Sequence, residues 1–456
     1  GGGATSWWVA AGDERVKVAA PVCGTATLAS HIRDRTIDGH CDCMWWTNTY
    51  RWDLADVGAL IAPRPLLIAS ANRDAIFTIE SIREVHAQLQ RLYALLAAEE
   101  NLRLVETPGP HSYHERSRTA IFSWFARHLQ GREIPPEQVG DIELNPERLE
   151  TAQTLRVFVN GPLPDDRTPT IQESFIPVAK PPTISSPEAL RHERERVIAA
   201  LREKTFGAFP VNPPALDPRI EFEFTSVENP SARFSFVSEE GWRLFGRVVM
   251  PEGAGRPLPA VVVLRSPGEE RGASETFAGR VRAPWAKVVV EPRGTGETAW
   301  GEELNWHVRR ASAWTGRTVA SMRVWDTLRA LRAVRWLPQV AGRPLSLAAR
   351  GEMVAVALYA ALLDGNVEAL FLEEAPPTQN APSQRDGRGP SIEMLNCLRV
   401  TDLPQVAGLL FPARLVFVGA RPAAYDWAAD LYRALGAPEN VVAVEDLSSW
   451  RPWKEK

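Results

Sequence analysis

Asp74 and His111 are the residues whose type and placement could carry acid–base chemistry. Asp74 ends RPLLIASANRD, an apolar segment typical of a buried strand, and His111 lies in ETPGPHSYHE directly after the apolar LRLVE. In a Ser-His-Asp triad the acid holds the histidine tautomer and the histidine moves the proton. His114 competes for the role of base, and His111 is favoured because it lies nearer the end of the strand. Asp74 could also be an ordinary solvated loop residue.

A triad also needs a nucleophile, which α/β-hydrolases place on a sharp turn between a strand and a helix. The turn is crowded, so small residues flank it. The segment Gly1–Gly3 followed by helix-compatible sequence fits the part of such a turn that comes after the serine. The alternative interpretation of these glycines is a cloning remnant or a flexible tail.

A third group of candidate residues lies in GHCDCMWWTNTYRWD, which begins at Gly39. Its Cys-x-Cys pair with one histidine invites a zinc interpretation, but the spacing is not that of a structural zinc site, so we expect no metal here. We expect a substrate pocket shaped by His40, Trp45 and Trp46. An ordinary core position for these tryptophans is the alternative.

The elements that would position these residues follow an α/β pattern. Residues 1–131 alternate apolar strand-like runs with helical periodicity, which predicts a parallel sheet. Residues 132–220 are richer in proline and charge and are predicted as a packed connector, with a possible strand at LRVFVN and a helix after Ser186. Residues 221–456 contain a hairpin around EEGW and then repeated strand-to-turn units, which predict a second, complete α/β unit.

This second unit lacks the expected chemistry. Its turn between strand and helix should fall in SLAARGEMVAV, where Arg350 stands at the expected nucleophile position. Arginine stays protonated and cannot attack a carbonyl carbon. Arg421 or Pro422 stands where the acid is expected, with Asp426 as a possible substitute, and the final strand contains no histidine. We therefore predict a degenerate copy.

Composition excludes some classes of function. The chain has 456 residues, 45% hydrophobic and 24% charged, with a net charge of -4. No basic run could follow a phosphate backbone, and no apolar stretch could cross a bilayer, so nucleic-acid and membrane partners are not expected. The four cysteines are too few for a disulfide scaffold and leave the compartment open.

Several segments resemble acetyl xylan esterase-like α/β-hydrolases: GGGATSWWVAAGDERVKVAAPV, GHCDCMWWTNTYRWD, PRPLLIASANRDAIF and GPH. The resemblance implies a serine directly before Gly1, the Gly1 N–H as an oxyanion-hole donor, Asp74 as acid and His111 as base. It implies the C-terminal half of one α/β-hydrolase domain in 1–131, followed by the degenerate copy.

The activity implied is hydrolysis of a small-molecule or acetylated carbohydrate ester through an acyl-enzyme, without a cofactor. The acetyl specificity comes from the family alone. Because the serine would lie outside it, the 456-residue chain itself is expected to be inactive. A prolyl oligopeptidase-type peptidase and a non-catalytic hydrolase-fold scaffold are the alternatives. The family allows a secreted or periplasmic protein, and the oligomeric state is left open.

Overall fold

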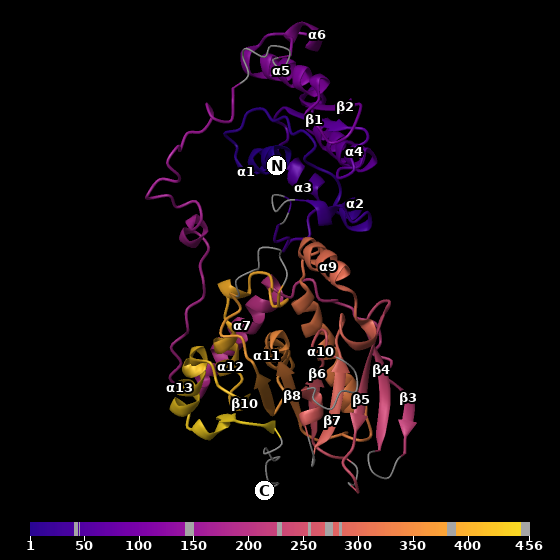
Figure 1. Ribbon diagram of the computed structural model, residues 1–456, viewed down its shortest axis with the longest axis vertical. Helices are drawn as coiled ribbons and strands as arrows, with labels where there is room; N and C mark the ends of the chain where they lie inside the picture. Colours follow the sequence, from indigo (N-terminus) through magenta and orange to yellow (C-terminus); the bar gives the residue numbers. More distant parts are fainter. Residues whose placement is uncertain are drawn as a thin grey trace. The chain divides into compact units, whose positions relative to one another are not determined.

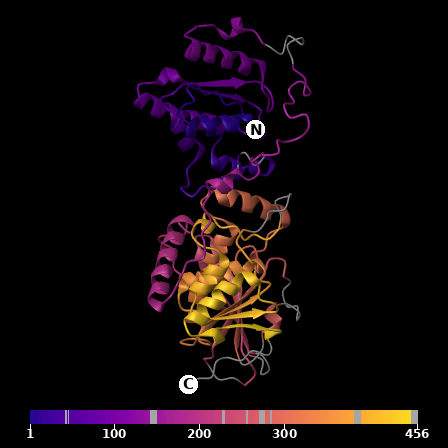
Figure 2. The ribbon, with the colours of Figure 1, turned by 90° about the vertical axis from the view of Figure 1, so that its left-hand side faces the viewer.

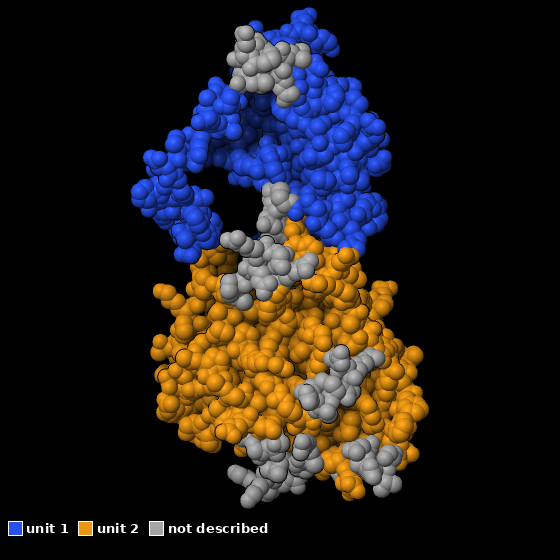
Figure 3. Space-filling model, viewed as in Figure 1, with its two compact units in different colours: residues 1–175 blue, residues 176–456 orange. Residues whose placement is uncertain are grey.

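The computed structural model describes residues 1–40, 44, 46–141, 150–225, 230–253, 257–269, 277–281, 285–380 and 389–447. The chain divides into two compact units, Gly1–Phe175 and Ile176–Lys456 (Figure 3). The boundary falls inside the segment predicted as a connector. Helix α6 (Pro136–Val139) therefore belongs to unit 1, and helix α7 (Pro187–Lys204) belongs to unit 2.

Unit 1 alternates helices with parallel strands. Its further elements are α1 (Gly2–Gly12), α2 (Leu28–Arg33), η1 (Thr36–Gly39), α3 (Leu54–Ala59), β1 (Leu66–Ala71), α4 (Ile79–Leu95), η3 (Glu99–Asn101), β2 (Leu102–Thr107), α5 (Glu115–Gln130) and η6 (Ile171–Ser174). Strands β1 and β2 pair in parallel, with Leu66 opposite Leu102. The expected strand VKVAAPV adds two parallel bridges, from Ala19 and Val22 to β1.

Helices cover both faces of this small sheet (Figure 2). On one face Leu67 and Val105 pack against α5, where Trp124 is buried. Helix α1 contributes a second anchor, Trp7, which is fully buried and donates its indole N–H to the carbonyl of Leu54 at 3.2 Å. This packing fixes the start of α1 and the ends of the strands, where the candidate site residues lie.

Unit 2 contains a nine-stranded sheet (Figure 1). Its strands are β3 (Arg219–Phe224), β4 (Ser231–Glu239), β5 (Trp242–Val249), β6 (Ala260–Leu264), β7 (Ala286–Glu291), β8 (Leu345–Arg350), β9 (Ala369–Glu373), β10 (Arg414–Val418) and β11 (Val441–Val444). The helices are α7, α8 (Phe277–Arg280), η7 (Gly296–Thr298), α9 (Glu302–Trp314), α10 (Val319–Trp336), α11 (Glu352–Asp364), η8 (Cys397–Arg399), α12 (Leu403–Leu409), η9 (Ala423–Tyr425), α13 (Asp426–Ala434) and η10 (Pro438–Asn440).

The strand order is that of the α/β-hydrolase fold. It runs β11-β10-β9-β8-β6-β7-β5-β4-β3, so β6 and β7 exchange places relative to the chain. Strands β6 to β11 pair in parallel, whereas β5 pairs antiparallel with both β4 and β7. Strands β6 and β8 lie at the centre and are almost fully buried because both faces are covered. The predicted α/β-hydrolase fold is confirmed.

The same side-chain contacts recur in the two units. In each unit a tyrosine hydroxyl and an asparagine amide donate to carbonyls just before a strand, and an aspartate caps the helix ahead of that strand. In unit 1, Tyr93 donates to the carbonyl of Arg64, Asn101 donates to that of Pro63, and Asp53 is the cap. In unit 2, Tyr432 donates to the carbonyl of Ala413, Asn440 donates to that of Pro412, and Asp402 is the cap. The start of β1 in unit 1 and the start of β10 in unit 2 therefore have matching side-chain contacts.

One predicted element is absent. Residues 155–160, the LRVFVN segment, form turns and bends instead of a strand, and the side chains of Leu155 and Val157 are exposed. A strand needs partner backbone groups, whereas the Leu155 N–H bonds locally to the carbonyl of Thr151. None of the helices in the described ranges has the length and apolarity that crossing a bilayer requires.

Candidate active site

Asp74 lies on the loop after β1, and its carboxylate is held from two sides. Oδ2 lies 2.7 Å from Nδ1 of His111, and Oδ1 accepts the backbone N–H groups of Ile76 at 2.8 Å and Phe77 at 3.0 Å. The side chain is completely buried. A buried carboxylate with this many partners is a fixed hydrogen-bond acceptor that orients an imidazole.

His111 lies on the loop between β2 and α5, and 47% of its side chain is exposed. Because Nδ1 faces Asp74, proton transfer to a reacting group would use Nε2. The competing base, His114, is the N-cap of α5, where its Nδ1 accepts the N–H of Arg116 at 3.2 Å. The structure therefore brings His111, and not His114, against the acid.

The glycines at the start of the chain line the same cavity as His111. Gly1 caps α1, and Gly2 and Gly3 form its first turn. The backbone N–H groups and the dipole of a helix N-terminus favour negative charge there. Gly3 packs so closely on the turn at Gly24 that a Cβ atom on it would lie 2.0 Å from the carbonyl oxygen of Val22. This close approach ties the start of α1 to the end of the VKVAAPV segment.

His40, which the sequence analysis predicts as a pocket residue, also lines this cavity. Its Nε2 lies 3.2 Å from Nδ1 of His31, a fully buried residue that the sequence analysis missed. Burial, and then the charge of His40, lower the pKa of His31 to about 3. The ring of Phe77 contacts two of the histidines. It packs edge-on against His31 and is stacked with His111 at a centroid distance of 5.9 Å.

The structure describes one of the two tryptophans predicted for the pocket, Trp46, and it does not line this cavity. Trp46 packs against Trp8, with ring centroids 4.6 Å apart, and is not among the described residues that line the cavity. Trp45 lies outside the described residues, as do Cys41 and Cys43. The structure thus places His40 with His111 and places Trp46 elsewhere in unit 1.

Cys23 is the second residue that the sequence analysis missed. It directly follows VKVAAPV, and its thiol, Asp74 and His111 each offer one polar atom within 4.8 Å of the others. Burial, and then the nearby carboxylate of Asp74, raise the pKa of the Cys23 thiol. A protonated thiol is a poor nucleophile. Its position after a buried strand, at the same sheet edge as Asp74, was the signal that could have identified it.

Unit 2 has a different set of residues at the corresponding places. The sharp turn between β8 and α11 falls on Gly351, with φ 57° and ψ −127°, one residue beyond the predicted Arg350. Arg350 instead pairs with Glu374 at 2.7 Å, and this hydrogen bond raises the pKa of the arginine. Ala423 lies as far beyond Ala413 as Asp74 lies beyond Arg64, and it directly follows the predicted Arg421 and Pro422. The sequence after residue 447 lies outside the described residues.

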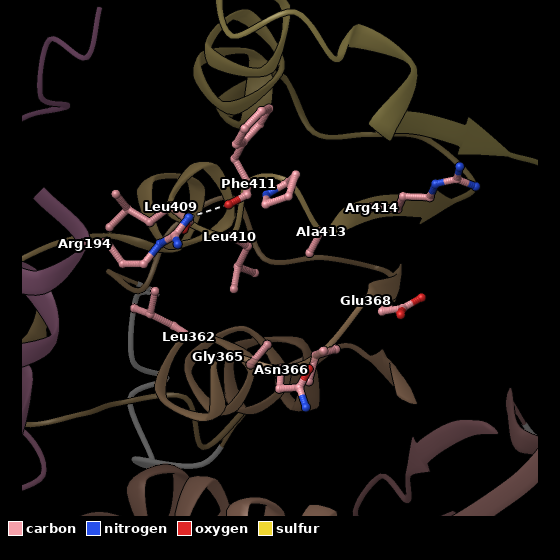
Figure 4. Close-up of a pocket in the computed structure, with 13 residues that line it drawn as sticks. Arg194, Leu362, Gly365, Asn366, Glu368, Leu409, Leu410, Phe411, Ala413 and Arg414 are labelled. Carbon is pink, nitrogen blue, oxygen red and sulfur yellow. Dashed lines mark hydrogen bonds between the residues drawn. The ribbon is translucent and has the colours of Figure 1, made fainter. Parts of the chain in front are cut away.

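A second cavity, which lies in unit 2, is at the amino ends of β9 and β10, away from the turn at Gly351. Arg194 of α7 donates to the carbonyls of Leu409, at 2.7 Å, and Phe411 there (Figure 4). Leu409 ends α12, so its carbonyl has no partner within the helix, and Phe411 lies two residues beyond it. The arginine therefore acts as a helix cap that joins α7 to the rest of unit 2.

Comparison with known proteins gives partial matches. No family model matches the chain. The chain is 27% identical over 111 residues to "Putative hydrolase YtaP" of Bacillus subtilis (strain 168), which covers 24% of this chain and 37% of that protein. The chain thus spans little more than a third of this curated relative.

Among solved structures, the chain is similar to one described as a "putative acetyl xylan esterase" from Bacteroides fragilis NCTC 9343. The TM-score is 0.48 at 14% identity, over 58% of this chain and 78% of that one. It is also similar to a glucuronoyl esterase from Solibacter usitatus, with a TM-score of 0.43 at 11% identity, over 57% of this chain and 87% of the other.

Proposed function

We propose that unit 1 carries the acid and base of a serine carboxylic-ester hydrolase. Asp74 is the acid, His111 is the base, and a serine directly before Gly1 is the nucleophile. The observation that carries this proposal is the 2.7 Å contact between the buried carboxylate and a half-exposed imidazole, beside a cavity that the start of α1 also lines. Substrates would be small-molecule esters or acetylated carbohydrates, as the family resemblance implies.

In this mechanism Nε2 of His111 takes the serine proton while the serine oxygen attacks the ester carbonyl carbon. The Gly1 N–H stabilises the resulting oxyanion, and Asp74 stabilises the imidazolium. His111 then protonates the departing alcohol, leaving an acyl-enzyme. Water, deprotonated by the same imidazole, attacks that acyl group and releases the acid and the free serine.

The proposed place of the serine is supported by the matching turns of the two units. Cys23 and Glu374 end matching strands, and both have a positive φ, 46° and 51°. Gly1 precedes Cys23 by as many residues as Glu352 precedes Glu374, so Gly1 and Glu352 take matching positions in this alignment. The position before Gly1 then corresponds to Gly351, which occupies the sharp turn of unit 2. An α/β-hydrolase carries its nucleophile on this turn.

We also infer that unit 2 is a degenerate copy of the same domain. It has a glycine at the turn and an alanine at the acid position, and neither can act as a nucleophile or a triad acid. Tyr93 in unit 1 and Tyr432 in unit 2 make matching hydrogen bonds to the carbonyls of Arg64 and Ala413, which supports a common ancestry of the two units.

The proposal is tested with a protein extended upstream of Gly1 by its own coding sequence. Asp74→Asn and His111→Ala should each lower kcat for an aryl acetate by roughly 10⁴-fold without unfolding the protein. His114→Ala is the matched control and should change kcat little, because His114 caps α5. A fluorophosphonate should label the serine before Gly1 and should leave the 456-residue chain unlabelled.

Three outcomes would contradict this proposal. An inactive His114→Ala variant beside an active His111→Ala variant would reverse the assignment of the base. A residue other than serine before Gly1, with no ester hydrolysis, would favour the scaffold interpretation. Cleavage of peptides after proline, in preference to acetyl esters, would favour the peptidase interpretation.

A further inference from the structure

We propose that Cys23, Asp74 and His111 form a binding site for a divalent zinc-like cation. The three side chains come from three loops at one edge of the sheet, and one coordinating atom of each lies within 4.8 Å of the other two. Thiolate, imidazole and carboxylate are the three ligand types that zinc takes in proteins. The site is distinct from the Cys-x-Cys segment in which the sequence first suggested zinc.

Two of the three ligands are held in place before any ion arrives. Cys23 has a left-handed backbone, φ 46°, and its N–H donates to the carbonyl of Ala69 in β1 at 2.9 Å. Asp74 is fixed by the N–H groups of Ile76 and Phe77. A preformed arrangement of ligands lowers the ordering cost of binding.

The third ligand, His111, lies on a half-exposed loop and would make the necessary movement. Zinc–sulfur and zinc–nitrogen bonds of about 2.3 and 2.0 Å need ligand atoms roughly 3 to 4 Å apart. Only a small adjustment is therefore required from the present spacing. The carbonyl oxygen of Ser112, 3.8 Å from the Cys23 sulfur, or a water molecule would complete a tetrahedron.

Binding releases the thiol proton to solvent, moves the imidazole proton from Nδ1 to Nε2 so that Nδ1 can bind the ion, and forms a sulfur–metal bond, with no change of oxidation state. The ion would also take the carboxylate and the imidazole out of their mutual hydrogen bond. If the proposed esterase function holds, the bound ion is an inhibitor, because Asp74 and His111 are its acid and base. The metal-binding proposal itself does not depend on esterase activity.

The test is a cobalt titration of the 456-residue chain under anaerobic conditions, followed by competition with zinc. We expect a near-ultraviolet charge-transfer band from thiolate to cobalt, together with the visible bands of a tetrahedral site. Cys23→Ser should abolish the charge-transfer band and weaken zinc binding at least about tenfold, since losing even an outer-shell partner costs that much. Cys397→Ser, at the buried thiol of unit 2, is the matched control and should keep the band.

The double variant Cys41→Ser/Cys43→Ser decides between the two thiol-bearing segments. The band should survive in it; loss of the band there, or its survival in Cys23→Ser, would overturn the proposal. Zinc should also protect Cys23 from alkylation in the unmodified chain, a mass-spectrometric measurement that needs no variant. Unchanged alkylation at saturating zinc would equally overturn it. In the upstream-extended protein, zinc that protects Cys23 without inhibiting an active esterase would contradict the proposed roles of Asp74 and His111 and would leave the metal-binding proposal standing.

Discussion

Single residues decide how the candidate site is held. The carboxylate of Asp74 accepts two backbone N–H groups of its own loop, which set its position, and it contacts His111 on another loop. Phe77 contributes twice, through its N–H to the acid and through its ring against the base. Behind this ring lies the buried His31, whose neutrality has a measurable consequence.

Acid should destabilise the fold through His31. Its folded pKa is lowered to about 3 by burial and by His40, whereas an unfolded histidine titrates near 6.5. Above pH 6.5 both states are neutral, so His31 then has no effect. Between about 6.5 and 3 only the unfolded state binds the proton, and the free energy of unfolding falls by about 1.4 kcal/mol per pH unit.

Urea unfolding at pH 7 and pH 5 measures this effect. His31→Asn, which can keep a polar atom near Thr36, should lose about 2 kcal/mol less than the unmodified chain between these pH values. His192→Asn, at an exposed position on α7, is the control and should leave the pH dependence unchanged. Equal losses in the His31→Asn variant and the unmodified chain would show that another group carries the dependence.

At the scale of elements, the start of α1 is set by its contact with the turn at Gly24. A Cβ atom on Gly24 would lie 2.1 Å from the backbone of Gly3, so Gly3→Ala and Gly24→Ala should each destabilise unit 1 by about 1 to 3 kcal/mol. Gly12→Ala is the matched control: it meets no atom within 4 Å and should be neutral or slightly stabilising. Thermal unfolding followed by circular dichroism provides the comparison, and an unaffected Gly3→Ala variant would refute the close approach.

The junction of α7 with α12 gives a second prediction at this scale. Arg194→Met removes the donors to the carbonyls of Leu409 and Phe411 and should lower the stability of unit 2 by about 1.5 to 3 kcal/mol. Arg191→Met, on an exposed face of the same helix, should change it by less than about 0.5 kcal/mol. Equal effects of the two substitutions in urea unfolding would show that the cap contributes nothing.

At the scale of the whole molecule, the division into units predicts what can fold alone. Residues 176–456 should give a folded protein without esterase activity, because the turn and acid positions of unit 2 lack reactive side chains. Residues 221–456 should be less stable, since they lose α7 and its buried Leu190, Val197 and Leu201. Guanidinium unfolding and an aryl acetate assay compare the two proteins. Hydrolysis by either protein would mean that unit 2 is not degenerate.

The sequence by itself determined the features that depend on neighbouring residues. Apolar runs located β1 and β2, Ser186 and Gly131 marked the ends of helices, and the order of elements predicted the hydrolase fold. Asp74 and His111 were candidates for the same reason: each follows a strand, and parallel strands carry such residues to one edge of the sheet.

Tertiary structure decided what depends on residues distant in the chain. The sequence favours His111 over His114 only by its place nearer the strand end, whereas the packing of β1 beside β2 gives His111 the partner Asp74 and leaves His114 as a helix cap. The place of Cys23 beside that pair arises from its bridges to β1 in the same way. LRVFVN forms no strand because a strand requires hydrogen-bonding partners that local sequence cannot supply.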